Sequence, residues 1–99
     1  MADREANFAA LIEVLGQAQD AVHRELELRQ AQEFDREALL RLLASVRSFA
    51  DQAQSLFRLM ANSDPDEVSM VEIAKANELA TSFLETEDRI EAVLELGRW

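Results

Sequence analysis

The 99-residue sequence contains few of the residues on which active sites usually depend. It has no cysteine and no tyrosine, one histidine, one tryptophan, one proline and two glycines. The lack of cysteine excludes disulfides and thiolate metal sites. The shortage of glycine and proline, with abundant Ala, Leu, Glu, Gln and Arg, is typical of helices rather than strands. We therefore expect an all-α protein.

Signals for targeting and for crossing a membrane are also missing. Residues 1–16 have no basic region ahead of their apolar run and no small-residue cleavage site. No apolar run reaches the length of about 18 residues that a membrane-spanning helix needs. We therefore expect a soluble, cytoplasmic protein. Nine arginines against one lysine are typical of a GC-rich bacterial genome.

The charge is strongly negative and unevenly distributed. The net charge is −10 at pH 7, and residues 1–34, 35–62 and 63–99 carry −4, +1 and −7, respectively. Nucleic acids and anionic membranes repel such a chain, so we expect neither as a direct partner. The last segment predicts an acidic helix face, which in most proteins is simply a solvated surface.

The clearest pattern is an uninterrupted heptad in the middle of the chain. It predicts a helix over residues 36–61 whose apolar seam alternates steps of three and four residues. The seam is Leu39, Leu42, Val46, Phe49, Ala53, Leu56 and Met60, widened by Leu43, Ala50 and Phe57. A seam this wide serves a helix with two neighbours, which favours a bundle over a two-stranded coiled coil.

A first helix is predicted over residues 3–32, with Asp3 as its N-cap. Its buried stripe would be Phe8, Leu11, Ile12, Leu15, Ala18, Val22 and Leu26. The following turn is signalled by Asp35, a good N-cap for the next helix, and by Phe34, which can pack on Leu39 as a hydrophobic staple. Because no Gly or Pro marks this break, a continuous helix through residues 30–37 is an alternative.

A third helix is predicted over residues 65–96. Asp64 would be its N-cap, Pro65 its first residue and Glu67 the partner in a capping box. Its apolar stripe is Ile73, Ala76, Ala80, Phe83, Ile90 and Leu94, flanked by Val68, Leu79, Leu84 and Val93. Glu87 interrupts this stripe, so either the helix kinks there or Glu87 reaches solvent at the edge of the bundle.

Short links between long helices predict one domain (residues 1–99), an up-down-up antiparallel three-helix bundle with coiled-coil-like packing. Gly97 is the expected C-cap of the last helix, and Trp99 beyond it either folds back onto the bundle or stays exposed as an interface anchor. The apolar residues left outside the seams are Leu28, Leu40, Leu96 and Trp99. This surplus predicts a homodimer, with Trp99 and the end of the last helix near the two-fold axis.

The single histidine, His23, lies next to the seam and is expected to face solvent. A lone exposed imidazole on a small helical bundle resembles the layout of histidine phosphotransfer domains, so this function is an alternative. Those domains follow the histidine with a Lys and a Gly, whereas here Arg24-Glu25-Leu26-Glu27 follows, and two acids oppose a phosphoryl group. Asp20 and His23 also form a carboxylate–histidine pair of the kind found in di-iron bundles, but such a site needs a second pair. Both residues are more simply surface side chains.

No catalytic set, Gly-rich phosphate loop or group of metal ligands can be defended from the sequence. We therefore predict no enzymatic activity, no cofactor and no metal site. The remaining interpretation is a protein–protein interaction module, a small acidic helical adaptor, chaperone or inhibitor that binds another protein with a basic surface. An alternative is an acidic mimic of nucleic acid that blocks the basic groove of its partner. The predicted partner-binding residues are Glu72, Glu78, Glu85, Asp88, Glu91, Glu95 and Trp99.

Overall fold

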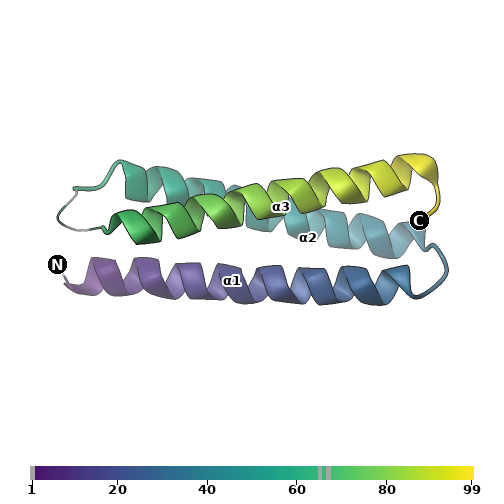
Figure 1. Ribbon diagram of the computed structural model, residues 1–99, viewed down its shortest axis with the longest axis horizontal. Helices are drawn as coiled ribbons and strands as arrows, with labels where there is room; N and C mark the ends of the chain where they lie inside the picture. Colours follow the sequence, from purple (N-terminus) through teal and green to yellow (C-terminus); the bar gives the residue numbers. More distant parts are fainter. Residues whose placement is uncertain (1, 65, 67) are drawn as a thin grey trace.

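The chain folds into a bundle of three helices, with no strand in the residues that the structure describes. The computed structural model describes residues 2–64, 66 and 68–99, and the side chains of residues 8–64, 66 and 68–99. The helices are α1 (Ala2–Gln30), α2 (Arg36–Ala61) and α3 (Met70–Leu96), and the bundle measures 50 × 19 × 17 Å (Figure 1). The predicted all-α class is thereby confirmed. Within these residues, no stretch of helix is long and apolar enough to cross a bilayer.

The links and the chain ends gather at the two ends of the bundle. Figure 1 shows the first turns of α1 at the same end of the bundle as the end of α2 and the start of α3, and the C-terminus at the end that holds the first link. Near the C-terminal end, Arg36 donates a hydrogen bond to the carbonyl oxygen of Leu94 at 3.3 Å. Most contacts between helices join α2 to α3, and α1 packs less closely against both.

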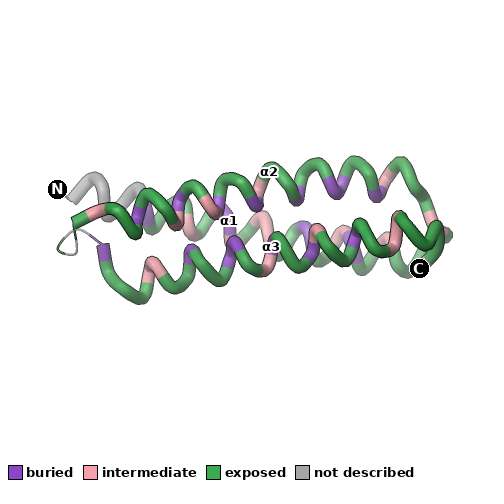
Figure 2. Tube along the Cα trace, turned by 90° about the horizontal axis from the view of Figure 1, so that it is seen from above, coloured by how far each residue is buried: buried purple, intermediate pink, exposed green. Residues whose placement is uncertain are grey.

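The heptad of α2 forms the centre of the core, as its pattern predicts. Eight of its ten apolar residues are buried, and the other two, Phe49 and Phe57, are half-buried against the core. The rings of Phe49 and Phe83 stack with their centroids 5.6 Å apart, which joins α2 to α3. Figure 2 shows the buried positions recurring along the helices at one side, with exposed positions between them. This spacing is that of a helix buried along one broad stripe.

The first predicted turn is confirmed, because α1 and α2 are separate helices and the continuous helix through residues 30–37 is not formed. The Asp35 carboxylate accepts a hydrogen bond from the backbone N–H of Ala38 at 3.1 Å, which satisfies one of the free donors at the start of α2. Phe34 is half-buried and packs against the core. At the other end of α1, the helix already begins at Ala2, so Asp3 lies within it rather than before it.

The predicted start of the third helix at residue 65 is wrong, because α3 begins at Met70. The Asp64 carboxylate accepts a hydrogen bond from the backbone N–H of Asp66 at 3.2 Å. This bond to the second residue on closes a local turn, and such a turn competes with helix initiation at the same residue. Pro65 and Glu67, the other members of the predicted capping box, lie outside the described residues.

The ends of α3 are fixed by Ser69 and Gly97. The Ser69 hydroxyl accepts a hydrogen bond from the backbone N–H of Glu72 at 3.1 Å, which is the geometry of an N-cap. Gly97 adopts a left-handed conformation with φ of 72°, and its N–H bonds the carbonyl of Val93 at 2.9 Å. The prediction of Gly97 as the C-cap is therefore confirmed, since this conformation favours glycine.

The interruption at Glu87 does not break α3. The helix is continuous from Met70 to Leu96, and Glu87 lies half-buried at its edge, facing Arg47 of α2 at 3.0 Å. The inward position one residue earlier is taken by Thr86, which is buried and donates its hydroxyl hydrogen to the carbonyl of Ser82 at 2.9 Å. A polar residue is therefore accommodated in the core without an unsatisfied hydroxyl.

The predicted stripe of α1 is only partly buried. Its buried members are Phe8, Leu15, Val22 and Leu26, while Ile12 and Ala18 are half-buried against the core. Leu11 is 48% exposed, although the sequence pattern places it in the core. Because α1 packs loosely against α2, the side of α1 that carries Leu11 is left open.

Candidate protein-interaction surface

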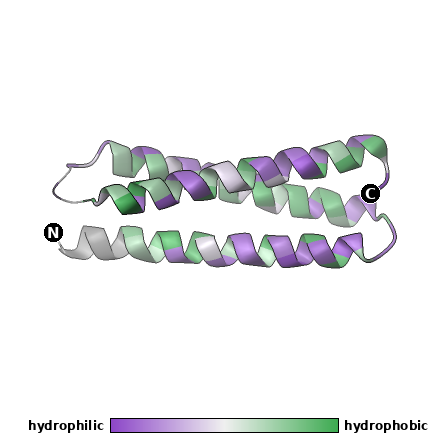
Figure 3. Ribbon diagram, viewed as in Figure 1, coloured by the Kyte–Doolittle hydropathy of each residue, from purple (hydrophilic) through white to green (hydrophobic). Residues whose placement is uncertain are grey.

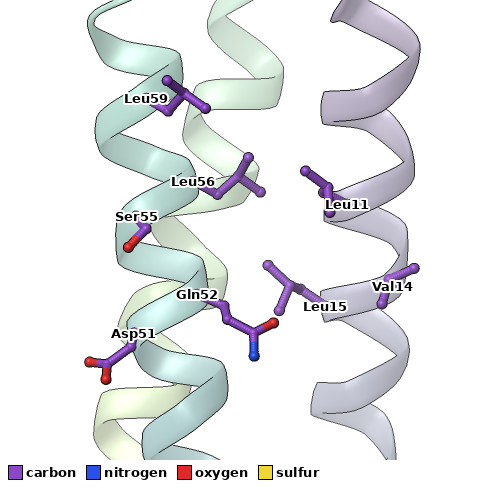
Figure 4. A pocket seen from close by; sticks show the side chains of 8 residues that line it. All are labelled: Leu11, Val14, Leu15, Asp51, Gln52, Ser55, Leu56 and Leu59. Atoms are coloured by element: carbon purple, nitrogen blue, oxygen red, sulfur yellow. The ribbon is translucent and has the colours of Figure 1, made fainter.

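An open apolar groove runs between α1 and α2. Its volume is about 410 Å³, and it is lined by Leu11, Val14, Leu15, Asp51, Gln52, Ser55, Leu56 and Leu59 (Figure 4). The buried side chains of Leu15 and Leu56 form its floor. Leu11, Val14 and Leu59 stand at its rim with 48%, 59% and 58% of their surface exposed. Clustered large apolar side chains in contact with water are a common mark of a protein interface.

A second apolar series continues from this groove along α1. Val14, Ala21 and Leu28 are all exposed and lie seven residues apart, so they share one side of the helix. We call these three residues the α1 outer stripe. Its neighbours at three- and four-residue steps include the apolar Ala10, Leu11 and Ala18 and the polar Gln17, Arg24 and Glu25, so the stripe is most apolar towards its N-terminal end. In Figure 3 apolar residues are concentrated in the first half of α1, where the groove lies, and polar residues predominate in its second half.

The sequence pattern alone does not distinguish the α1 outer stripe, because α1 has apolar residues on two sides. The inward series and the outer series share Leu11 and Ala18, so a single broad stripe accounts for both. The two series differ in direction, since Val14 and Ala21 each lie about 100° around the helix from the buried residues Leu15 and Val22.

The opposite side of α1, towards α3, is mainly polar. Gln19 donates a hydrogen bond from its side chain to the hydroxyl of Ser82, which ties the middle of α1 to α3. A shallow hollow beside this bond is lined by Ile12, Gly16, Gln19, Lys75, Glu78, Leu79 and Ser82. The exposed apolar surface of α1 therefore lies on the side of α2 rather than on the side of the most acidic helix.

Four of the six predicted acidic residues share the outer side of α3. Glu78, Glu85, Asp88 and Glu95 are exposed, and at about 100° per residue they span roughly a third of the helix circumference. We call these four residues the α3 acidic face. No ion pair joins any of them to another side chain within the part of the chain whose side chains are described.

The other two predicted acids lie in structural positions. Glu72 is half-buried in the first turn of α3, where its backbone N–H is capped and where a negative charge is favourable to the helix dipole. Glu91 accepts a hydrogen bond from Arg47 at 2.6 Å, next to the bond between Arg47 and Glu87. Two hydrogen bonds raise the pKa of Arg47 above its usual value, the bond to Glu91 more than the bond to Glu87. Arg47 therefore stays charged at any ordinary pH.

The side chain of Trp99 lies against the bundle. It is half-buried and packs against the core, because the left-handed turn at Gly97 ends the helix before it. Its indole Nε1 is buried and has no hydrogen-bond partner among the described residues. The other three surplus residues, Leu28, Leu40 and Leu96, are exposed.

His23 is exposed on α1, beside a small hollow lined by Leu26, Glu27, Gln30 and Arg89. Arg89 offers a positive charge there, but the carboxylate of Glu27 shares the same hollow and would repel a phosphoryl group. Among the described residues, no group of three or more His, Asp or Glu side chains is placed to hold a metal ion.

Comparisons with known proteins found no relative of this chain. No protein-family model matches the chain, and neither the curated proteins nor the solved structures contain a match. The function must therefore be inferred from the surface of the molecule itself, where an apolar groove and an acidic face lie on different sides of the bundle.

Proposed function

We propose that this chain is a non-enzymatic protein–protein interaction module, acting as a small acidic helical adaptor, chaperone or inhibitor. The observation that carries the proposal is the apolar groove between α1 and α2, whose rim residues Leu11, Val14 and Leu59 stay in contact with water. Fully burying one such side chain contributes about 1.5–3 kcal/mol, and about half of each of the three is exposed, so covering all three contributes roughly 2–5 kcal/mol.

The proposal takes the molecule to be an up-down-up antiparallel bundle. The pairing of Arg36 with Leu94 and of Arg47 with Glu91 supports this direction for α2 and α3, since the residue numbers rise in one helix as they fall in the other. In such a bundle the α3 acidic face and the groove point in different directions. The acidic face then suits a protein partner with a basic surface, and the groove suits an apolar one.

Site-specific photo-crosslinking in living cells tests this proposal. A photoreactive amino acid would replace Leu59 in the groove, Asp88 on the acidic face or, as a control, the exposed Ala9, which lies on another side of α1. We expect covalent adducts at position 59 or 88 that are absent at position 9, and loss of the position 59 adduct when Val14 is changed to Glu. Equal adduct formation at all three positions, or none at any, contradicts the proposal.

Enzymatic activity on a small molecule would also contradict the proposed function. The decisive observation would be turnover that is lost when one polar side chain, such as that of His23, is replaced while the helical content and the melting temperature are retained. Incubation with a phosphorylated response regulator covers the phosphotransfer alternative, and we expect no transfer of label to His23.

A further inference from the structure

We infer that the partner of the α1–α2 groove is a second copy of this chain, paired through antiparallel α1 helices about a two-fold axis at Ala21. This inference rests on the proposed function, because it names the occupant of the same groove. Four features of the molecule support this pairing: the symmetry of the α1 outer stripe, the fit of one side chain into the groove, the distribution of charge, and the size of the contact.

The outer stripe is self-complementary under a two-fold axis. Val14 and Leu28 lie seven residues on either side of Ala21, and all three are exposed. When two copies of α1 run in opposite directions with their Ala21 residues facing, Val14 of each copy meets Leu28 of the other. Large side chains then face large ones, and the small Ala21 lies at the centre, where it lets the helices approach closely.

The groove provides a place for Leu28 of the second copy. Val14 is both a member of the stripe and part of the groove lining, so the leucine that faces it also reaches the groove mouth. There it can contact Leu11 and Leu59, the other two exposed residues of the rim. The two-fold axis makes this contact twice, so each Leu28, which is 59% exposed in one chain, is covered by the groove of the other.

The charge distribution favours this face over the others. The segments that contain α1, α2 and α3 carry −4, +1 and −7, so a contact made by α1 and the adjoining side of α2 brings together less negative charge than one made by α3. Gln19 faces α3 through its bond to Ser82, and Ala21 lies about 200° further around α1, so the stripe points away from the acidic helix. Glu25, the one acid among the nearest neighbours of the stripe, is paired with Arg29 at 2.9 Å. Pairing through α1 therefore brings few like charges together.

The size of the contact predicts a weak dimer. From Leu11 to Leu28 the stripe spans about 26 Å along the helix, and two neighbouring helices present a face roughly 20 Å wide. Each copy would therefore bury about 500 Å², or roughly 1,000 Å² in total, which is below the range of about 1,200–2,000 Å² for stable complexes. We expect association that depends on concentration, and that strengthens with added salt because salt screens the negative charge of both copies.

Cysteine cross-linking tests the geometry, since the natural chain has no cysteine. Ala21→Cys should form a disulfide between two copies, because facing residues at the axis come within the 4.4–6.8 Å between Cα atoms that a disulfide requires. Val14→Cys should not link to itself, because two such residues lie about 21 Å apart along antiparallel helices. A mixture of Val14→Cys and Leu28→Cys should give the mixed disulfide, and Ala9→Cys, on another side of α1, should give none.

Sedimentation equilibrium of two charge variants tests the energetics. Ala21→Glu and Ala9→Glu each add one negative charge at an exposed alanine of the same helix. Ala21→Glu places two carboxylates against each other at the axis and should weaken dimerisation at least about tenfold. Ala9→Glu should leave the dimerisation constant unchanged, so it controls for total charge and helix propensity.

Each outcome has one meaning. A chain that stays monomeric, equal effects of Ala21→Glu and Ala9→Glu, or a disulfide between two Val14→Cys chains overturns the antiparallel pairing. If the photoreactive group at position 59 then still captures a different protein, the proposed function stands without the dimer. If neither position 59 nor position 88 captures anything, both proposals fail.

Discussion

Replacing Phe83 with alanine should destabilise the protein much more than replacing Leu15 with alanine, although both residues are buried. Phe83 is 1% exposed, and its ring stacks on Phe49 at 5.6 Å with an angle of 30° between the planes. Phe-to-Ala changes in cores cost about 3–5 kcal/mol, and an aromatic pair contributes about 0.5–1.5 kcal/mol beyond burial. A domain of this size is stable by only about 5–15 kcal/mol, so the loss is a large fraction of the total.

Leu15 is 4% exposed, but it forms the floor of the open groove, so part of its surroundings can relax into the space that its side chain leaves. We expect Leu15→Ala to cost about 2–3 kcal/mol, the lower part of the range for buried leucines. The expected difference between the two variants is about 1–3 kcal/mol, and it combines the larger, stacked side chain of Phe83 with the tighter packing of α2 on α3.

Urea denaturation followed by far-UV circular dichroism, at low protein concentration, provides the comparison. The midpoints should fall in the order wild type, Leu15→Ala, Phe83→Ala, with similar m-values. Phe83→Leu is the matched control, because it keeps most of the volume and should cost less than about 1.5 kcal/mol. A larger loss for Leu15→Ala than for Phe83→Ala would refute the loose packing of α1.

Five further substitutions test particular positions. Ser69→Ala should lower the free energy of unfolding by about 0.5–2 kcal/mol, because it removes the N-cap of α3. Asp64→Ala should lower it less, because Asp64 does not cap the helix, and the urea midpoints of the two variants distinguish them. Gly16→Ala should stabilise the protein by about 0.5–1 kcal/mol, since the added methyl group has no atom within 4 Å apart from its two chain neighbours and the backbone of its own helix, while Gly97→Ala should destabilise it because φ is 72° there. Arg47→Glu should lower the melting temperature by setting three acids together, and the loss should shrink at 1 M salt, where the Debye length is about 3 Å.

The features that could be predicted from the sequence are those that local pattern decides. The heptad of α2, its Asp35 cap and the Gly97 cap of α3 depend on residues close together in the chain, and the structure contains all three. The start of α3 could not be decided in the same way. Residues 64–72 contain two possible capping sequences, one beginning at Asp64 and one at Ser69, and the turn that Asp64 makes with Asp66 selects the second.

The open groove could not be predicted because it depends on how closely α1 approaches α2. Leu11 has the spacing of a core residue and would be buried if the helices were closer. The six acids that the sequence predicts as one surface likewise occupy different positions in the structure. Glu91 pairs with Arg47 across the helices and Glu72 belongs to the start of α3, so only the remaining four form an outward face.

The position of the interface is tested most directly by hydrogen exchange at low and at high protein concentration. Protection should rise with concentration in residues 10–28 of α1 and in residues 52–59 of α2, which contain the α1 outer stripe and the α2 side of the groove. Residues 81–92 of α3 should exchange at the same rate at both concentrations. Protection that rises in α3 instead, or that does not depend on concentration anywhere, would contradict self-association through the groove.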